Sequence, residues 1–203
     1  MKKAHIDAAL KHLKKDARMK VLIKAHPARP QHGHGRDPFE SLARAIVFQQ
    51  LSGKAAGTIW DRVAAYYPGQ HPTAALVAKT PAAKFRKAGV SAQKAGYLKD
   101  LADKFLDGTI NPKLFSKMTD EEVREHVTGV KGIGRWTADT FMMFTLNRPD
   151  IMPTGDLGIQ KGMQMLCNLK KLPSPEQMEK LSKDWSPHRT VACWYLWRSL
   201  DNR

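Results

Sequence analysis

The chain has 203 residues, of which 42% are hydrophobic, so it is long enough and apolar enough to bury a core, which excludes an intrinsically disordered protein. Lys and Arg number 34 against 19 Asp and Glu, and the formal net charge of +15 favours a polyanionic partner. Two cysteines, Cys167 and Cys193, provide no disulfide framework, and the longest apolar run, 191–197, is too short for a membrane span. We therefore expect an intracellular globular protein.

Apolar residues recur at helical spacing along the chain, and no stretch alternates as a half-buried strand does, so the sequence predicts an all-α fold. A basic helix is expected from Ile6 to Ala25, followed by a loop over 26–36. Asp37–Glu40 then combines an N-cap, a first-turn proline and a capping box, and the helix that it opens is expected to end near Gln50. Further helices are expected at 54–66, 73–78, 81–88, 91–106 and 119–127, and beginning near 135, 156, 174 and 186.

A turn with two glycines joins two of these helices. Gly132 and Gly134 flank Ile133, which we expect to anchor the turn in the core. Glycine permits a tight bend and a close approach of the backbone to another molecule, and the N–H groups that open the next helix form a site for a phosphate oxygen. An ordinary helix end followed by a turn would show the same short pattern.

The segment V-K-G-I-G-R-W-T-A-D, residues 130–139, resembles the hairpin of the helix-hairpin-helix DNA glycosylases, of the 3-methyladenine DNA glycosylase II type. The resemblance extends over about 38–200. It implies two helical lobes with a DNA-binding cleft between them, and a hairpin that contacts the DNA backbone through Lys131, Gly132, Ile133, Gly134 and Arg135. It also implies a monovalent cation (Na⁺ or K⁺) held by the main-chain carbonyls of Thr128, Val130 and Ile133. No other cofactor is expected.

The resemblance divides the chain into a basic N-terminal helix and loop, 1–37, packed on a glycosylase domain, 38–203. Residues 1–30 contain nine Lys and Arg and two Asp, and 9 − 2 gives this stretch a charge of +7. The stretch is either a DNA-facing stripe or a solvated helix face, and the sequence leaves both open.

Asp156 follows a Pro/Gly loop and begins an apolar-periodic helix. An acid at this place is usually a helix cap. The resemblance instead identifies Asp156 as the catalytic carboxylate. A fixed negative charge beside C1′ stabilises the oxocarbenium-like sugar of N-glycosidic hydrolysis. An alkylated purine is already cationic and leaves readily, so a second carboxylate is not required.

Two kinds of residue that other members of this superfamily use are missing here, and this limits the reactions that the chain is expected to catalyse. Members with lyase activity carry a lysine where this chain has Trp136, and that lysine forms a Schiff base with the sugar. Iron–sulfur members need four cysteine ligands, and this chain has two. The resemblance therefore implies a monofunctional hydrolase that leaves an intact abasic site.

A buried base must be flipped out of the duplex before it can react. By resemblance, Leu51 would fill the gap in the duplex, with Gln50 and Ser52 touching neighbouring bases in the minor groove. Burial of Leu51 between two helices is the alternative. The flipped base would lie against Trp136 and Trp197, with Thr140 and Leu157 where some relatives have tyrosines, whereas Trp60, Trp185 and Trp194 are assigned to the core.

The expected function is the excision of alkylated purines, such as 3-methyladenine and 7-methylguanine, from double-stranded DNA in base excision repair. The expected protein is a monomer of the cytoplasm, associated with the nucleoid, or of the nucleus in a eukaryote. A DNA-binding protein without catalysis is the first alternative, and a glycosylase for oxidised or mismatched bases the second. His32 and His34 form an H-x-H pair without a third metal ligand at suitable spacing.

Overall fold

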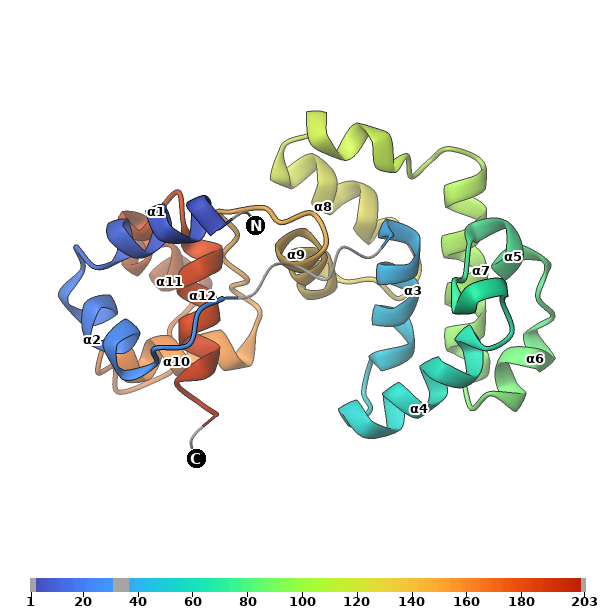
Figure 1. Ribbon diagram of the computed structural model, residues 1–203, viewed down its shortest axis with the longest axis horizontal. Helices are drawn as coiled ribbons and strands as arrows, with labels where there is room; N and C mark the ends of the chain where they lie inside the picture. The colour runs from blue at the N-terminus through green and yellow to red at the C-terminus, as the bar shows by residue number, and fades with distance from the viewer. Residues whose placement is uncertain (1–2, 31–36, 202–203) are drawn as a thin grey trace. The chain divides into compact units, whose positions relative to one another are not determined.

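The computed structural model describes residues 3–30 and 37–201, and every regular element in these ranges is helical (Figure 1). The predicted all-α fold is confirmed. The His32/His34 pair and most of the loop expected at 26–36 lie outside the described residues. Within the described ranges, no helix combines the length and apolar character that crossing a membrane would require.

The chain divides into two compact units, residues 1–34 with 142–203, and residues 35–141. The described helices of the first unit are α1 (Lys3–Leu13), α2 (Ala17–Ala25), α10 (Leu157–Leu166), α11 (Pro175–Leu181) and α12 (Arg189–Arg198), with the short 3₁₀ helix η3 (Lys183–Trp185). The second unit holds α3 (Pro38–Phe48), α4 (Gly53–Ala64), η1 (Pro68–Gln70), α5 (Ala74–Lys79), α6 (Ala82–Lys87), α7 (Ala92–Leu106), η2 (Pro112–Lys117) and α8 (Asp120–Thr128). The boundary between the units falls within α9 (Arg135–Phe144).

The prediction of a single helix over Ile6–Ala25 is wrong, because the helix is interrupted before Asp16 and the segment forms α1 and α2 instead. Asp16 adopts an extended backbone and caps α2, since its Oδ1 accepts from the N–H groups of Arg18 (2.8 Å) and Met19 (3.2 Å). Its Oδ2 accepts from the indole N–H of Trp185 (3.0 Å). Burial alone would raise the pKa of Asp16, but these hydrogen bonds and the Arg18 guanidinium hold it well below its usual range.

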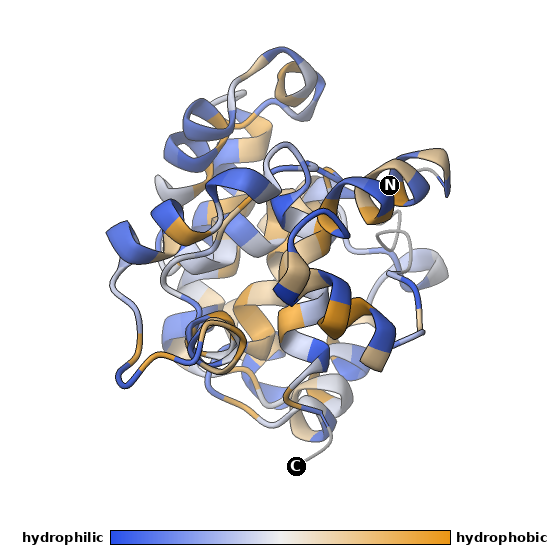
Figure 2. Cartoon of the chain, turned by 90° about the vertical axis from the view of Figure 1, so that its left-hand side faces the viewer, coloured by the Kyte–Doolittle hydropathy of each residue, from blue (hydrophilic) through white to orange (hydrophobic). Residues whose placement is uncertain are grey.

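In the first unit, α1 and α2 both pack against α12, and α2 also packs against α10. The helices carry apolar and polar residues side by side, as Figure 2 shows. Trp185 and Tyr195 are among the largest fully buried side chains of this unit. The prediction that Trp185 belongs to the core is confirmed, but Trp194 is only half-buried, with its ring edge-on to Tyr195.

In the second unit, α7 is the central element and packs against α3, α5 and α6. Its apolar side chains Leu98 and Leu101 are fully buried, and Trp60 of α4 is buried as predicted. The first turn of α3 has the predicted cap and proline, since Asp37 caps it and Pro38 opens it, while the Glu40 carboxylate pairs with His71 at 3.2 Å. Because α7 packs against three helices, it can support the loops at its edge.

Candidate active site and DNA-contacting elements

Asp156 is the N-cap of α10, and only 7% of its surface is exposed. Its Oδ1 accepts two hydrogen bonds, from the backbone N–H of Ile159 (2.8 Å) and from the indole Nε1–H of Trp197 (3.0 Å). Asp156 therefore caps a helix, as its place in the sequence suggested, and its carboxylate has a fixed orientation. Its sequence neighbours Gly155 and Leu157 are exposed, so Asp156 lies directly beneath the surface of the unit.

Gly158 makes the contact between Asp156 and Trp197 possible. A Cβ at residue 158 would lie 2.9 Å from Cδ1 of Trp197 and 3.0 Å from Oδ1 of Asp156, both too close for ordinary packing. The ring of Phe144 lies next to the Trp197 indole, with centroids 5.8 Å apart. Sequence reasoning assigned Trp197 to the base pocket but missed its hydrogen bond to the carboxylate, and it missed Phe144 and Gly158.

Replacing Trp197 with Phe removes the indole N–H but keeps an aromatic ring. If Asp156 is the catalytic carboxylate that the hairpin resemblance implies, base excision under single-turnover conditions should slow about tenfold, since one charge-assisted hydrogen bond that orients it is lost. The fall in stability should be small, because Ile159 still donates to Asp156. An unchanged excision rate would show that the indole N–H does not assist the carboxylate.

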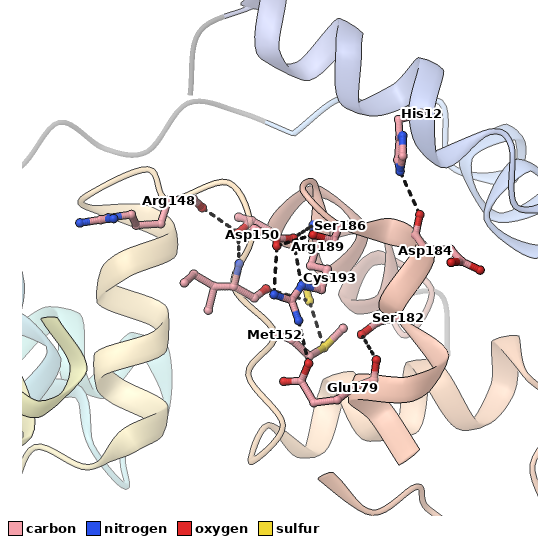
Figure 3. A network of polar contacts seen from close by, with 12 residues as sticks. His12, Arg148, Asp150, Met152, Glu179, Ser182, Asp184, Ser186, Arg189 and Cys193 are labelled. Atoms are coloured by element: carbon pink, nitrogen blue, oxygen red, sulfur yellow. Dashed lines mark hydrogen bonds and ion pairs between the residues drawn. The ribbon is translucent and has the colours of Figure 1, made fainter. Parts of the chain in front are cut away.

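The loop that leads to Asp156 is anchored by polar contacts with the start of α12 (Figure 3). Asp150 accepts from Ser186 Oγ (2.7 Å) and from Nε (2.9 Å) and Nη2 (3.0 Å) of Arg189. Thr190 Oγ1 donates to Arg148 O (2.7 Å) and accepts from the N–H of Ile151 (3.0 Å). Burial would raise the pKa of Asp150, but Arg189 and Ser186 lower it overall. Asp150 therefore has a structural role.

The hairpin has the predicted construction, with α8, a glycine turn and α9. Gly132 has φ +81°, and a Cβ there would lie 2.1 Å from the Tyr97 ring of α7. Ile133 is buried, as predicted, and Gly134 has open space around its missing Cβ. The side chains of Lys131 and Arg135 are 75% and 61% exposed, and they form surface ion pairs with Asp100 (4.0 Å) and Glu121 (3.6 Å).

A buried ion pair joins the two helices of the hairpin, and sequence reasoning gave it no role. Arg124 of α8 donates from Nε to Oδ1 of Asp139 on α9 at 2.9 Å, and Asp139 is 1% exposed. Burial raises the pKa of Asp139, and the Arg124 hydrogen bond and charge only partly oppose this. An acid within the apolar run W-T-A-D-T-F-M-M-F was the signal in the sequence.

The predicted intercalating loop leaves Leu51 exposed to 41%, so the alternative that it is buried between helices is wrong. Gln50 precedes it with φ +57°, a left-handed conformation that is uncommon outside glycine. Ser52 caps α4 through its Oγ, which accepts from Ala55 N–H (3.3 Å), and remains exposed. The loop therefore projects an apolar side chain between two polar ones.

The remaining predicted site residues lie at the end of α8, in the hairpin turn and on α9, apart from Leu157 and Trp197 of the other unit. Trp136 is 50% exposed, and the Thr140 hydroxyl donates to the carbonyl of Trp136 (3.1 Å), so it is directed along its own helix. Trp136 and Thr140 belong to the unit of residues 35–141, and Asp156, Leu157 and Trp197 to the other, so their grouping into one pocket stays a prediction. In the turn, Val130 O accepts from the N–H of Ile133 (3.0 Å).

The family profile described as HhH-GPD superfamily base excision DNA repair protein matches residues 43–188. The chain belongs to this superfamily. The family resemblance seen in the hairpin is thereby confirmed. Proteins similar to this chain include DNA-3-methyladenine glycosylase 1 of Schizosaccharomyces pombe, 39% identical over 81% of this chain and 73% of its own length.

Two solved structures are similar over nearly the whole chain. The Schizosaccharomyces pombe 3-methyladenine DNA glycosylase in complex with abasic DNA has a TM-score of 0.84 and 35% identity, covering 97% of this chain and 98% of the other. The DNA-3-methyladenine glycosidase of Bacillus halodurans has a TM-score of 0.85 and 33% identity, covering 94% and 88%. These relatives support the predicted class of HhH-GPD protein, an alkylbase DNA glycosylase of base excision repair.

Proposed function

We propose that this HhH-GPD protein hydrolyses the N-glycosidic bond of alkylated purines in duplex DNA, with Asp156 as its catalytic carboxylate. The observation that carries the proposal is the fixed orientation of Asp156, whose Oδ1 accepts from Ile159 N–H and Trp197 Nε1–H. Relatives named as 3-methyladenine glycosylases support the substrate class.

In this mechanism the bond between C1′ and the purine nitrogen breaks, and its electron pair neutralises the cationic base. The negative charge of Asp156 stabilises the positive charge that develops on the sugar. A water oxygen then bonds to C1′, and its proton passes to the carboxylate or to solvent. Trp136 stands where a lyase has its lysine, so the products are a free base and an intact abasic site.

Access to the base requires flipping. Leu51 is exposed on a loop between Gln50 and Ser52, and a side chain of this kind fills the gap that the base leaves, which offsets part of the lost stacking. The N–H groups at the start of α9 bind DNA phosphate, with Lys131 and Arg135 beside them. The carbonyls of Thr128, Val130 and Ile133 would hold a monovalent cation. Val130 O already accepts one hydrogen bond and retains a second lone pair for such an ion.

The direct test uses the whole chain and duplex DNA that carries 3-methyladenine, 7-methylguanine or ethenoadenine, under single-turnover conditions. We expect free methylated bases, and strands that break only after alkali treatment. Strand breaks without alkali would contradict the absence of lyase activity. DNA binding without release of any base would favour the alternative of a non-catalytic DNA-binding protein. Sedimentation of the free protein and of its DNA complex tests the expected monomer.

Binding should depend strongly on salt, because the net charge of +15 favours contacts with several phosphates. If six or more phosphates are contacted, raising the salt from about 50 to about 200 mM should weaken binding roughly 1,000-fold or more. Fluorescence anisotropy with an undamaged duplex measures this dependence. A flat response would contradict the electrostatic interpretation.

A further inference from the structure

One face of α7 supports both the Leu51 loop and the glycine hairpin, the two elements of the second unit that we propose to contact DNA. Lys94, Tyr97 and Asp100 follow one another at three-residue spacing, which places them along an inclined ridge of the helix. Tyr97 fills the space beside Gly132, and Asp100 Oδ2 accepts from the backbone N–H of Lys131 (2.8 Å). The hairpin turn therefore rests on two of these side chains.

The third side chain, Lys94, holds the end of α3. Its Nζ donates to the carbonyls of Val47 (2.9 Å) and Gln49 (2.6 Å), which lie just before the Leu51 loop. Carbonyls at the end of a helix lack hydrogen-bond partners within the helix and carry partial negative charge. A lysine there donates hydrogen bonds to them and also compensates this charge. Burial lowers the pKa of Lys94. The carbonyls of Val47 and Gln49 take the place of part of the water around its ammonium.

Gln49 connects the loop to the hairpin. Its Nε2 donates to the carbonyl of Gly132 at 2.7 Å, while its own carbonyl accepts from Lys94. The next residue, Gln50, has φ +57°, a conformation that persists only where the surroundings hold it. A continuous chain of contacts thus runs from Lys94 through Gln49 to Gly132.

We propose that Lys94 is a positioning residue for base flipping, which holds the Leu51 loop in register with the glycine hairpin through Gln49. The inference rests on the proposed function, because it assigns the purpose of the loop. Lys94 does not touch the reacting atoms. It acts through Leu51, and a misplaced Leu51 slows extrusion of the base.

The test compares Lys94→Met with Lys99→Met. Lys99 is also on α7, and its Nζ donates to the carbonyl of Ala78 near the end of α5, remote in sequence from the Leu51 loop and the hairpin. Both changes remove an ammonium that holds carbonyls near a helix end, two for Lys94 and one for Lys99, so both should lower stability. Only Lys94→Met should slow single-turnover excision, by about 10- to 100-fold at saturating enzyme, because a small misplacement caused far from the chemistry can cost a factor of this size.

A double-mutant cycle with Leu51→Ala separates positioning from general destabilisation. The readouts are the excision rate and the fluorescence of a 2-aminopurine beside the lesion, which reports unstacking. If Lys94 acts through Leu51, then Lys94→Met has little further effect in the Leu51→Ala background, and Lys94→Arg restores most of the activity. Independent, multiplicative effects, or equal loss in Lys99→Met, would overturn the proposal. A wild-type protein that releases no base would instead contradict the proposed function.

Discussion

Asp156→Asn is expected to reduce the release of methylated purines by about 100- to 1,000-fold, the range seen when one electrostatic contributor to a transition state is removed. The amide oxygen of Asn can still accept from Ile159 N–H and Trp197 Nε1–H, and Asn is itself a good helix cap. Capping and packing should therefore survive, while the negative charge is lost. Quantification of free bases from methylated duplex DNA measures the effect.

The control is Asp150→Asn, which removes a half-buried carboxylate from the network in Figure 3 without touching Asp156. Because Asp150 pairs with Arg189 at 2.9 Å, this variant should lose stability. Thr190 still holds the loop through Arg148 O and Ile151 N–H, so excision should stay near the wild-type rate well below the melting temperature. DNA affinity should be unchanged in both variants. Equal excision by Asp156→Asn and wild type would remove Asp156 from the mechanism.

Local features of the fold were readable from the sequence, because caps and turns depend on a few adjacent residues. The Asp37 cap with Pro38, the helix start expected at 119 and the glycine turn all appear in the structure. The break at Asp16 is equally local, and Asp is a favoured N-cap. It was missed because the basic residues on both sides continue the helical pattern, and the N–H of Trp185, which fixes Asp16, lies 169 residues away in sequence.

The site was only partly predictable, because its residues meet through tertiary contacts. Asp156 and Trp197 were named separately, but their hydrogen bond joins residues 41 positions apart. The contact of Lys94 with the end of α3 spans 45 positions, and nothing in the periodicity of α7 distinguishes Lys94 from a solvated lysine. The role of Gly158 could not be predicted from the sequence, because it depends on the Trp197 ring, which occupies the space of the missing side chain.

Gly132→Ala is expected to lower the free energy of unfolding by at least about 2 kcal/mol and to weaken DNA binding severely. An L-residue in the left-handed region costs roughly 1–2 kcal/mol, and here φ is +81°. The new Cβ would also lie 2.1 Å from the Tyr97 ring, so that ring or the turn must move. Moving the turn displaces the carbonyl that accepts from Gln49, and with it the N–H groups at the start of α9.

Gly134→Ala is the matched control, because it adds the same methyl group two residues later. The position has no atom within 4 Å of an added Cβ and no positive φ, so stability should change little. Urea denaturation and anisotropy with an undamaged duplex give the two readouts for each variant. If Gly134→Ala keeps its stability but loses DNA affinity, its backbone approaches DNA too closely for a side chain. If Gly132→Ala is as stable as wild type, the contact with Tyr97 does not hold the hairpin turn.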